Sequence, residues 1–305
     1  MPAPPSTAGS AESAPKPLGK VIPLCPLRPM RERAFLCEAR HVMTSPLATP
    51  RWREAIRLIL PKEHGSWSLA LEPLMLGLIV APSAAGGALA FSVLAAFFLR
   101  RPLKLWLGGG ADPRRPQAFL CVVILAAMGM VGLILAAILA GPARLWPLLL
   151  AVPPGAAFVW FDSRGESREA AAEIAGSIAF AAAPAALASL AGWPADAALA
   201  VAVVMASRSV PAILTIRAYL RRNKGLPVSI APALTTSVAA VLASALLARA
   251  GLAPWTATVV MILLLVRAGL LLGLARPRLP ANRVGIAESV LGGVLVIVLA
   301  LSWIR

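Results

Sequence analysis

Nine apolar stretches follow one another through most of the chain, and each has about the length needed to cross a bilayer as a helix. They lie at about 66–82, 84–101, 118–140, 143–161, 170–191, 196–218, 229–250, 253–275 and 284–303. A hydrocarbon core ~30 Å thick requires roughly 20 apolar residues in a helix. The pattern therefore predicts an all-α fold, a polytopic membrane bundle of about nine transmembrane helices within residues 61–305.

The first 60 residues have a different character. Residues 1–50 are rich in Pro, Ala, Ser and Arg and lack a sustained apolar period, which predicts a disordered cytoplasmic tail. Residues 51–60 place Trp52 and Ile56 on one helical face and Arg53 and Arg57 on another. This segment is predicted to be a short amphipathic helix lying on anionic lipid headgroups.

Composition and charge agree with a membrane location. The chain has 59% hydrophobic and 14% charged residues, which excludes an ordinary soluble domain. Its net charge of +16 does not indicate nucleic acid, because the basic residues stand at the ends of apolar stretches. Cys25, Cys37 and Cys121 have no spacing typical of a metal site or a disulfide framework.

The basic residues also predict the orientation of the helices. With nine spans and a cytoplasmic N-terminus, 25 of the 29 Lys and Arg fall in the inner loops or in the spans that lead to them, Arg208 included. Three fall on the outer side, and Arg267 lies within the eighth span. The positive-inside rule then places the C-terminus outside. The high Ala, Arg and Pro content is typical of a bacterial inner (plasma) membrane protein.

Polar groups cluster where the first span begins, in the segment Pro61-Lys62-Glu63-His64-Gly65-Ser66-Trp67. On helical spacing His64 and Glu72 share a face, with Glu72 about 12 Å deeper in the bilayer. Histidine titrates near physiological pH, so Glu63 and His64 are candidates to accept or relay a proton. Glu72 is expected to orient His64 or to pair with a buried arginine.

The loop after the fourth span is the most acidic part of the chain. Four of the 13 carboxylates lie between residues 162 and 173, and Asp162, Glu166 and Glu173 are candidate ligands of Mg²⁺, which prefers oxygen. The alternative is an acidic first helical turn, stabilised by the helix dipole and by Arg164 and Arg168. The loop after the second span, residues 100–115, combines cations with a glycine run, so it either clamps a phosphate through Lys104 or only sets topology.

Two arginines fall inside predicted spans. Arg208 lies about 19 Å from Arg221 along the sixth span, and Arg267 lies within the eighth. Because lipid exposure of a charge is costly, both are expected to pair with Glu72, Glu173 or Glu288. Such pairs serve either packing alone or a binding cavity.

Three motifs together resemble the YwiC-like family of bacterial membrane proteins: PKEHGSW, FDSRGESREAAAEIAG and RSVPAILTIRAYLRR. The likeness runs over about residues 60–303, and EHGSW is its most specific part. The nine-helix layout, with polar loops after the second, fourth and sixth spans, is also similar to the UbiA superfamily of intramembrane prenyltransferases. Those enzymes bind Mg²⁺ and prenyl diphosphate through aspartate-rich motifs after the second and sixth helices. Here the first of these loops has only Asp112 and the other has no acidic residue.

Basic residues and clustered carboxylates gather on one membrane side next to the apolar spans, which favours a cytosol-facing intramembrane site for a prenyl diphosphate or another amphiphilic anion. Lys104, Arg208, Arg217 and Arg267 are then candidates to hold the anion, and the carboxylates at 162–173 to hold Mg²⁺, which would neutralise the leaving group. An inward-opening cavity holding His64, Glu173 and Arg208 is expected between the first, fifth, sixth and eighth spans. The alternatives are a transporter with a proton or anion path, and a noncatalytic membrane partner.

Overall fold

The computed structural model describes residues 58–304 apart from 61–63, 109–111 and 275–278, and for His64, Gly65 and Ser66 it describes the backbone alone. The predicted tail and most of the predicted interfacial helix, residues 51–60, therefore lie outside the described residues. Within them the chain is helical and contains no strand. The all-α prediction is confirmed.

The described residues form nine α-helices and one 3₁₀ turn. They are α3 (His64–Val80), α4 (Ala84–Leu107), α5 (Arg115–Ala140), η1 (Pro142–Leu145), α6 (Leu148–Ser163), α7 (Ala170–Leu190), α8 (Ala195–Asn223), α9 (Ala231–Arg249), α10 (Trp255–Gly273) and α11 (Ala281–Ile304). Seven are long and apolar enough to span a bilayer, while the apolar parts of α3 and α6 are shorter. Each matches one predicted stretch, so the chain is a multi-pass membrane protein.

Two helices continue well past their predicted ends. α4 runs through Pro102 to Leu107 instead of ending at Arg101, and α8 runs to Asn223 instead of 218. The prediction ended each helix where apolar residues end, but a helix bonds its own backbone and can continue into the headgroup region. The loop between α4 and α5 is correspondingly shorter than predicted. Lys104 lies on the last helical turns of α4 rather than in a loop.

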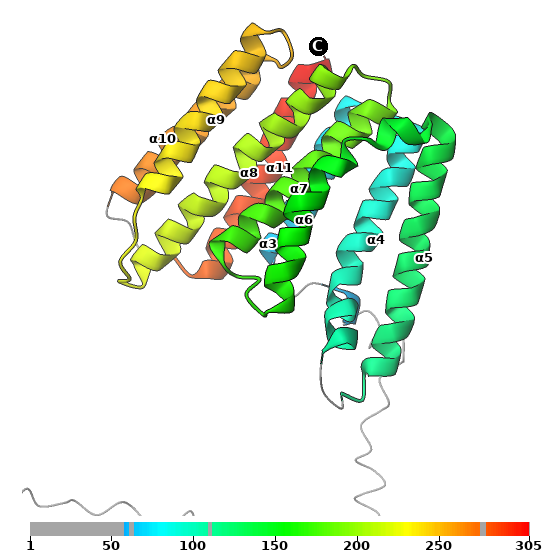
Figure 1. Cartoon of the computed structure of the whole chain (residues 1–305). Coiled ribbons are helices and arrows are strands. Elements are labelled where there is room, and N and C mark those ends of the chain that lie inside the picture. Colours follow the sequence, from blue (N-terminus) through cyan, green and yellow to red (C-terminus); the bar gives the residue numbers. More distant parts are fainter. Residues whose placement is uncertain (1–57, 61–63, 109–111, 275–278, 305) are drawn as a thin grey trace, which may run out of the picture. The chain divides into compact units, whose positions relative to one another are not determined.

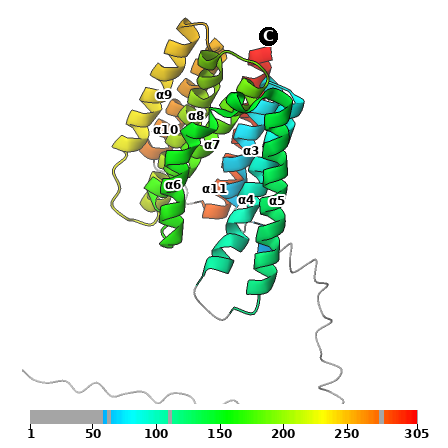
Figure 2. The ribbon, with the colours of Figure 1, turned by 45° about the vertical axis from the view of Figure 1, so that its right-hand side comes forward.

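The helices pack in a definite order. α4 lies against α5, α6 against α7, α7 against α8, and α8 and α10 against α9, while α3 pairs with both α7 and α11. Figures 1 and 2 show α4 and α5 side by side, with α9 and α10 together at the other side of the bundle. α10 and α11 follow each other in the chain but touch only sparingly.

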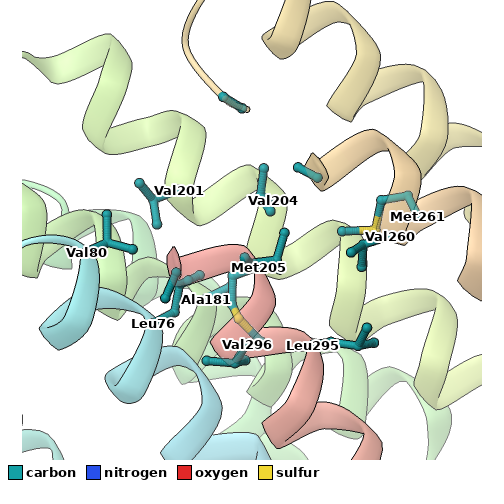
Figure 3. Packing of buried hydrophobic residues seen from close by; sticks show 14 of the residues in the cluster. Leu76, Val80, Ala181, Val201, Val204, Met205, Val260, Met261, Leu295 and Val296 are labelled. Carbon is teal, nitrogen blue, oxygen red and sulfur yellow. The ribbon is translucent and has the colours of Figure 1, made fainter. Parts of the chain in front are cut away.

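The main core lies where α3, α7, α8, α10 and α11 meet. It is built from medium-sized apolar side chains, among them Leu76, Val201, Met205, Met261 and Val296 (Figure 3). Membrane helices approach closely where side chains are small, and the buried face of α7 is mostly alanine. This core joins the C-terminal halves of α3 and α11 to the N-terminal half of α8.

Helix direction puts the basic loops on one side of the bundle. α3 begins there, and α4, α6, α8 and α10 end there; we call it the basic side. Figure 1 shows the loops after α4, α6 and α8 at the bottom and the C-terminus at the top. The alternation agrees with the predicted topology, in which the basic side faces the cytosol.

Candidate functional site

Glu72 of α3 and Arg208 of α8 form an ion pair in the middle of the bundle. Arg208 Nη1 lies 2.8 Å from Glu72 Oε2, and Arg208 Nη2 donates to Glu72 Oε1 at 3.1 Å. Both residues are buried, with 4% of Glu72 and 7% of Arg208 exposed. The close ion contact and this hydrogen bond together fix the two planar groups relative to each other. The expected pairing of Arg208 with a buried carboxylate is thus confirmed, and Glu72 is the partner.

Gly292 of α11 completes the surroundings of this pair. A Cβ atom at position 292 would collide with Glu72 Oε1 and Arg208 Nη2, so the glycine lets the backbone of α11 pass directly beside the charges. The sequence reasoning missed this residue. The only signal was a Gly-Gly pair in an otherwise apolar run, one helical turn after Glu288.

Arg267 of α10 and Glu288 of α11 form a second ion pair. Arg267 Nη2 contacts Glu288 Oε1, and Arg267 Nη1 donates to Glu288 Oε2 at 3.5 Å. This pair is less enclosed, with 29% of the Arg267 side chain and 17% of the Glu288 side chain exposed. The prediction that Arg267 pairs with an intramembrane carboxylate is also confirmed.

The two pairs bridge the same two groups of helices. Both carboxylates stand on α3 and α11, which pack together, and both arginines stand on α8 and α10, which are joined through α9. Glu288 is one helical turn from Gly292, so the pairs follow each other along α11. Arg267 is about 9 Å from the end of α10 on the basic side, whereas Arg208 is about 22 Å from the end of α8. The four charges thus extend from the basic half of the bundle to its centre.

One donor of this cluster has no partner. The Nε of Arg208 is buried and receives no hydrogen-bond acceptor among the described residues. A buried N–H without a partner costs roughly 1–3 kcal/mol. The guanidinium therefore retains capacity to bind an acceptor that the described residues do not supply.

A second polar cluster lies at the basic ends of α4 and α6. Asp162 accepts from Arg100 Nη2 and from Lys104 Nζ, both at 3.0 Å, and the Arg100 guanidinium also stands 4.6 Å from the centre of the Phe158 ring. Burial alone raises the pKa of Asp162, but the hydrogen bonds from the two cations outweigh it and hold that pKa below its usual value. Asp162 follows the apolar part of α6, so the cluster ties α4 to α6 at the membrane edge.

Glu173 has its own cation. Arg217 Nη1 lies 2.9 Å from Glu173 Oε2 and also donates to the Arg168 carbonyl at 2.6 Å, which fastens α8 to the start of α7. The exposed Glu166 lies in the turn between α6 and α7. Asp162, Glu166 and Glu173 thus occupy separate surroundings.

These carboxylates do not fit a magnesium site as arranged here. Over the described ranges, no three His, Cys, Asp or Glu side chains come close enough to hold a metal ion. A hard cation needs several oxygen ligands, and Asp162 and Glu173 already bind arginine or lysine. Glu173 and Arg208 also have different partners, so the predicted cavity that joins them with His64 remains a prediction.

The PKEHGSW segment is described only in part. Glu63 lies outside the described residues, and His64 opens α3 with its backbone. Trp67 packs edge-to-face against Phe97 and Phe98 of α4, with ring centres 6.0 and 5.7 Å apart, and Phe97 in turn contacts Phe180 of α7. The tryptophan therefore anchors the first turns of α3 to two neighbouring helices.

Comparison with known proteins identifies part of this arrangement. A family model described as YwiC-like protein matches residues 60–188. Residues 60–188 are a YwiC-like segment. No curated protein and no solved structure matched the chain.

The YwiC-like segment covers α3 to α7 almost entirely, including Glu72, Trp67 and the Asp162 cluster. It ends before α8, so the likeness predicted from the RSVPAILTIRAYLRR motif stays a prediction. Arg208, Arg267 and Glu288 all lie beyond the match. Each ion pair inside the membrane therefore uses at least one residue outside the YwiC-like segment.

Proposed function

We propose that the protein is a membrane carrier in which the Glu72–Arg208 and Arg267–Glu288 pairs form the path of a proton or an anion. The observation that carries the proposal is the enclosed Glu72–Arg208 pair, which places two ionisable groups at the centre of a membrane bundle. Ionisable residues inside membrane segments are costly and mark ion and substrate paths. The Nε of Arg208, which has no acceptor within the part of the chain that the structure describes, adds unused binding capacity at the same place.

The bridging pattern supports a working cycle. Exchange of the partners of Arg208 and Arg267 would loosen α8 and α10 from α3 and α11, because both ion pairs cross between these helix groups. A proton on Glu72 or an anion on Arg208 each removes the attraction that holds the groups together. Binding and movement are thereby coupled through the same side chains.

Proton flux in proteoliposomes tests this function. The full chain is reconstituted around a trapped pH dye, and a potassium diffusion potential drives protons inward. Wild-type vesicles are expected to acidify faster than empty ones. In Glu72→Gln vesicles the acidification rate above that of empty vesicles is expected to be at least tenfold smaller than in the wild type. Glu169→Gln, which changes an exposed acid in a loop, is the matched control and keeps the wild-type rate.

Two results would reject a proton path through these pairs: wild-type vesicles that acidify no faster than empty ones, or Glu72→Gln vesicles with unchanged flux. The double variant in which the two charges are exchanged, Glu72→Arg with Arg208→Glu, separates loss of flux through misfolding from loss of flux through the changed side chains. It keeps opposite charges at the two positions, so it is expected to elute as a folded protein and yet to conduct differently from wild type.

A second candidate is a site for prenyl diphosphate at the basic side. Its support is the half-exposed pair of cations on Asp162, where Arg100 and Lys104 are available to an anionic headgroup. Arg217, on the neighbouring polar cluster, is a further anchor. Labelled farnesyl diphosphate, with and without Mg²⁺, tests it: binding that falls at least tenfold in Lys104→Gln supports the site, and absence of binding in the wild type rejects it.

A further inference from the structure

A shallow groove runs along α10 beside Arg267. Its lining is apolar apart from that one cation and consists of Leu263, Val266, Arg267, Leu270 and Leu271, around a volume of about 250 Å³. Leu263, Val266 and Leu270 are 58%, 53% and 45% exposed. On a membrane-spanning helix such exposed apolar side chains face lipid. The groove therefore offers a single positive charge to molecules already in the bilayer.

The Arg267–Glu288 pair is less enclosed than the Arg208–Glu72 pair. Arg267 and Glu288 are partly exposed, whereas Arg208 and Glu72 are enclosed. α10 and α11 also touch sparingly, although α10 packs along α9 and α8. Little besides the ion pair joins the two helices here, so another acid can replace Glu288 on Arg267 without disrupting a packed core.

We propose that the α10 groove binds an amphiphile with a single carboxylate or phosphate headgroup, taken directly from the bilayer. The headgroup takes the place of Glu288 on Arg267, and the chain lies on Leu263, Val266 and Leu270. A guanidinium binds both kinds of headgroup through two parallel hydrogen bonds. This inference rests on the proposed carrier function and names its substrate class.

A small hydrophilic anion fits the groove poorly. Arg267 is about 9 Å from the end of α10, so a fully hydrated ion would lose water on the way and gain only apolar contacts around the charge. An amphiphile already lies in the bilayer with its chain, and its headgroup needs to move only a short way inward. The apolar lining of the groove, the depth of Arg267 in the bilayer and its positive charge therefore all favour an amphiphilic anion.

Displacement of Glu288 connects the groove with the central pair. Glu288 precedes Gly292 by one turn of α11, and Gly292 lies against Glu72 and Arg208. A carboxylate released from Arg267 thus stands next to the central pair. Binding in the groove is in this way communicated to the pair whose opening the carrier requires.

Photolabelling tests the groove. The probes are a stearic acid that carries a diazirine in its chain and the methyl ester of the same acid, each added to the full chain in lipid nanodiscs. The acid is expected to label the segment 263–271 at least tenfold more than the ester, as mapped by mass spectrometry. Unlabelled dodecanoic acid and dodecyl phosphate compete in separate arms, which tells a carboxylate from a phosphate headgroup.

Variants sharpen the test. Arg267→Gln is expected to lower labelling by the acid at least tenfold, and Arg267→Lys to retain most of it because the charge remains. Glu288→Gln is expected to increase labelling several-fold, since it removes the competing carboxylate. Arg249→Gln, which changes an arginine in the last turn of α9, is the matched control and leaves labelling unchanged.

Equal labelling by acid and ester, or acid labelling that Arg267→Gln leaves unchanged, would overturn the inference. Proton flux separates this failure from failure of the carrier. Flux that depends on Glu72 without acid labelling of α10 refutes the substrate class and leaves the carrier standing. Labelling that depends on Arg267 without proton flux supports the groove and refutes the proton path.

Discussion

Glu72 and Arg208 lie 136 residues apart in the chain, yet their side chains meet at 2.8 Å in the centre of the bundle. The pair joins a helix of the YwiC-like segment to a helix beyond it. Neither charge is tolerable alone at this depth, so each residue requires the other. The first prediction follows from this mutual dependence.

Removal of one charge is expected to cost far more than removal of both. Glu72→Met or Arg208→Met leaves an unpaired buried charge, at a cost of about 3–5 kcal/mol, whereas the double variant restores neutrality and costs much less. Unfolding in mixed micelles of the four proteins measures the coupling. Additive losses in the double variant would show that the pair does not act as a unit.

Gly292→Ala is expected to destabilise the protein because the new Cβ would collide with the ion pair. Overpacking of this kind costs about 1–3 kcal/mol. Gly293→Ala is the matched control, since a Cβ at position 293 meets nothing within 4 Å. Thermal unfolding in detergent compares the two, and equal melting temperatures would contradict the close approach of α11.

The Asp162 cluster predicts a pH effect. The pKa of Asp162 is lowered in the folded protein, so the carboxylate stabilises it above the unfolded pKa of about 4, and this contribution is lost as the pH falls through the folded value. Asp162→Asn is expected to be less stable than wild type at pH 7 by up to about 1 kcal/mol, because Arg100 and Lys104 are half exposed. At pH values below the folded pKa of Asp162 the two proteins should unfold alike, and a difference that persists there would assign the effect to something other than ionisation.

Cysteine labelling tests the topology. In a background with Cys25, Cys37 and Cys121 replaced by alanine, Ser163→Cys lies on the basic side and Gly251→Cys on the opposite side. An impermeant maleimide added to intact cells should label only the cysteine at position 251, and disruption of the membrane should expose the other. Labelling of position 163 in intact cells would reverse the predicted orientation.

The helices were predictable because the bilayer fixes their length. Each predicted stretch corresponds to one helix. The clearest errors are at the basic ends of α4 and α8, where the apolar residues end but the helical backbone hydrogen bonds continue. The amphipathic helix at residues 51–60 depends on groups outside the described residues and stays a prediction.

The site was predictable in kind but not in detail. A charge in hydrocarbon is costly, so Arg208 and Arg267 were each expected to have an acidic partner. The sequence offered three candidate carboxylates and does not say which helices meet, so the partner of each arginine could not be predicted. Glu173 joined Arg217 because both lie near the basic ends of α7 and α8. Gly292 escaped prediction because its role depends on the register of α11 against two other helices.

That register limits how the bundle can move. If α11 slid by one turn along α3, position 292 would be taken either by Glu288, which brings a like charge to Glu72, or by Val296, whose branched side chain has no room there. Translation in either direction is thus blocked while Glu72 and Arg208 remain joined. α11 can then only tilt or rotate about its own axis, because the Glu72–Arg208 pair blocks its translation.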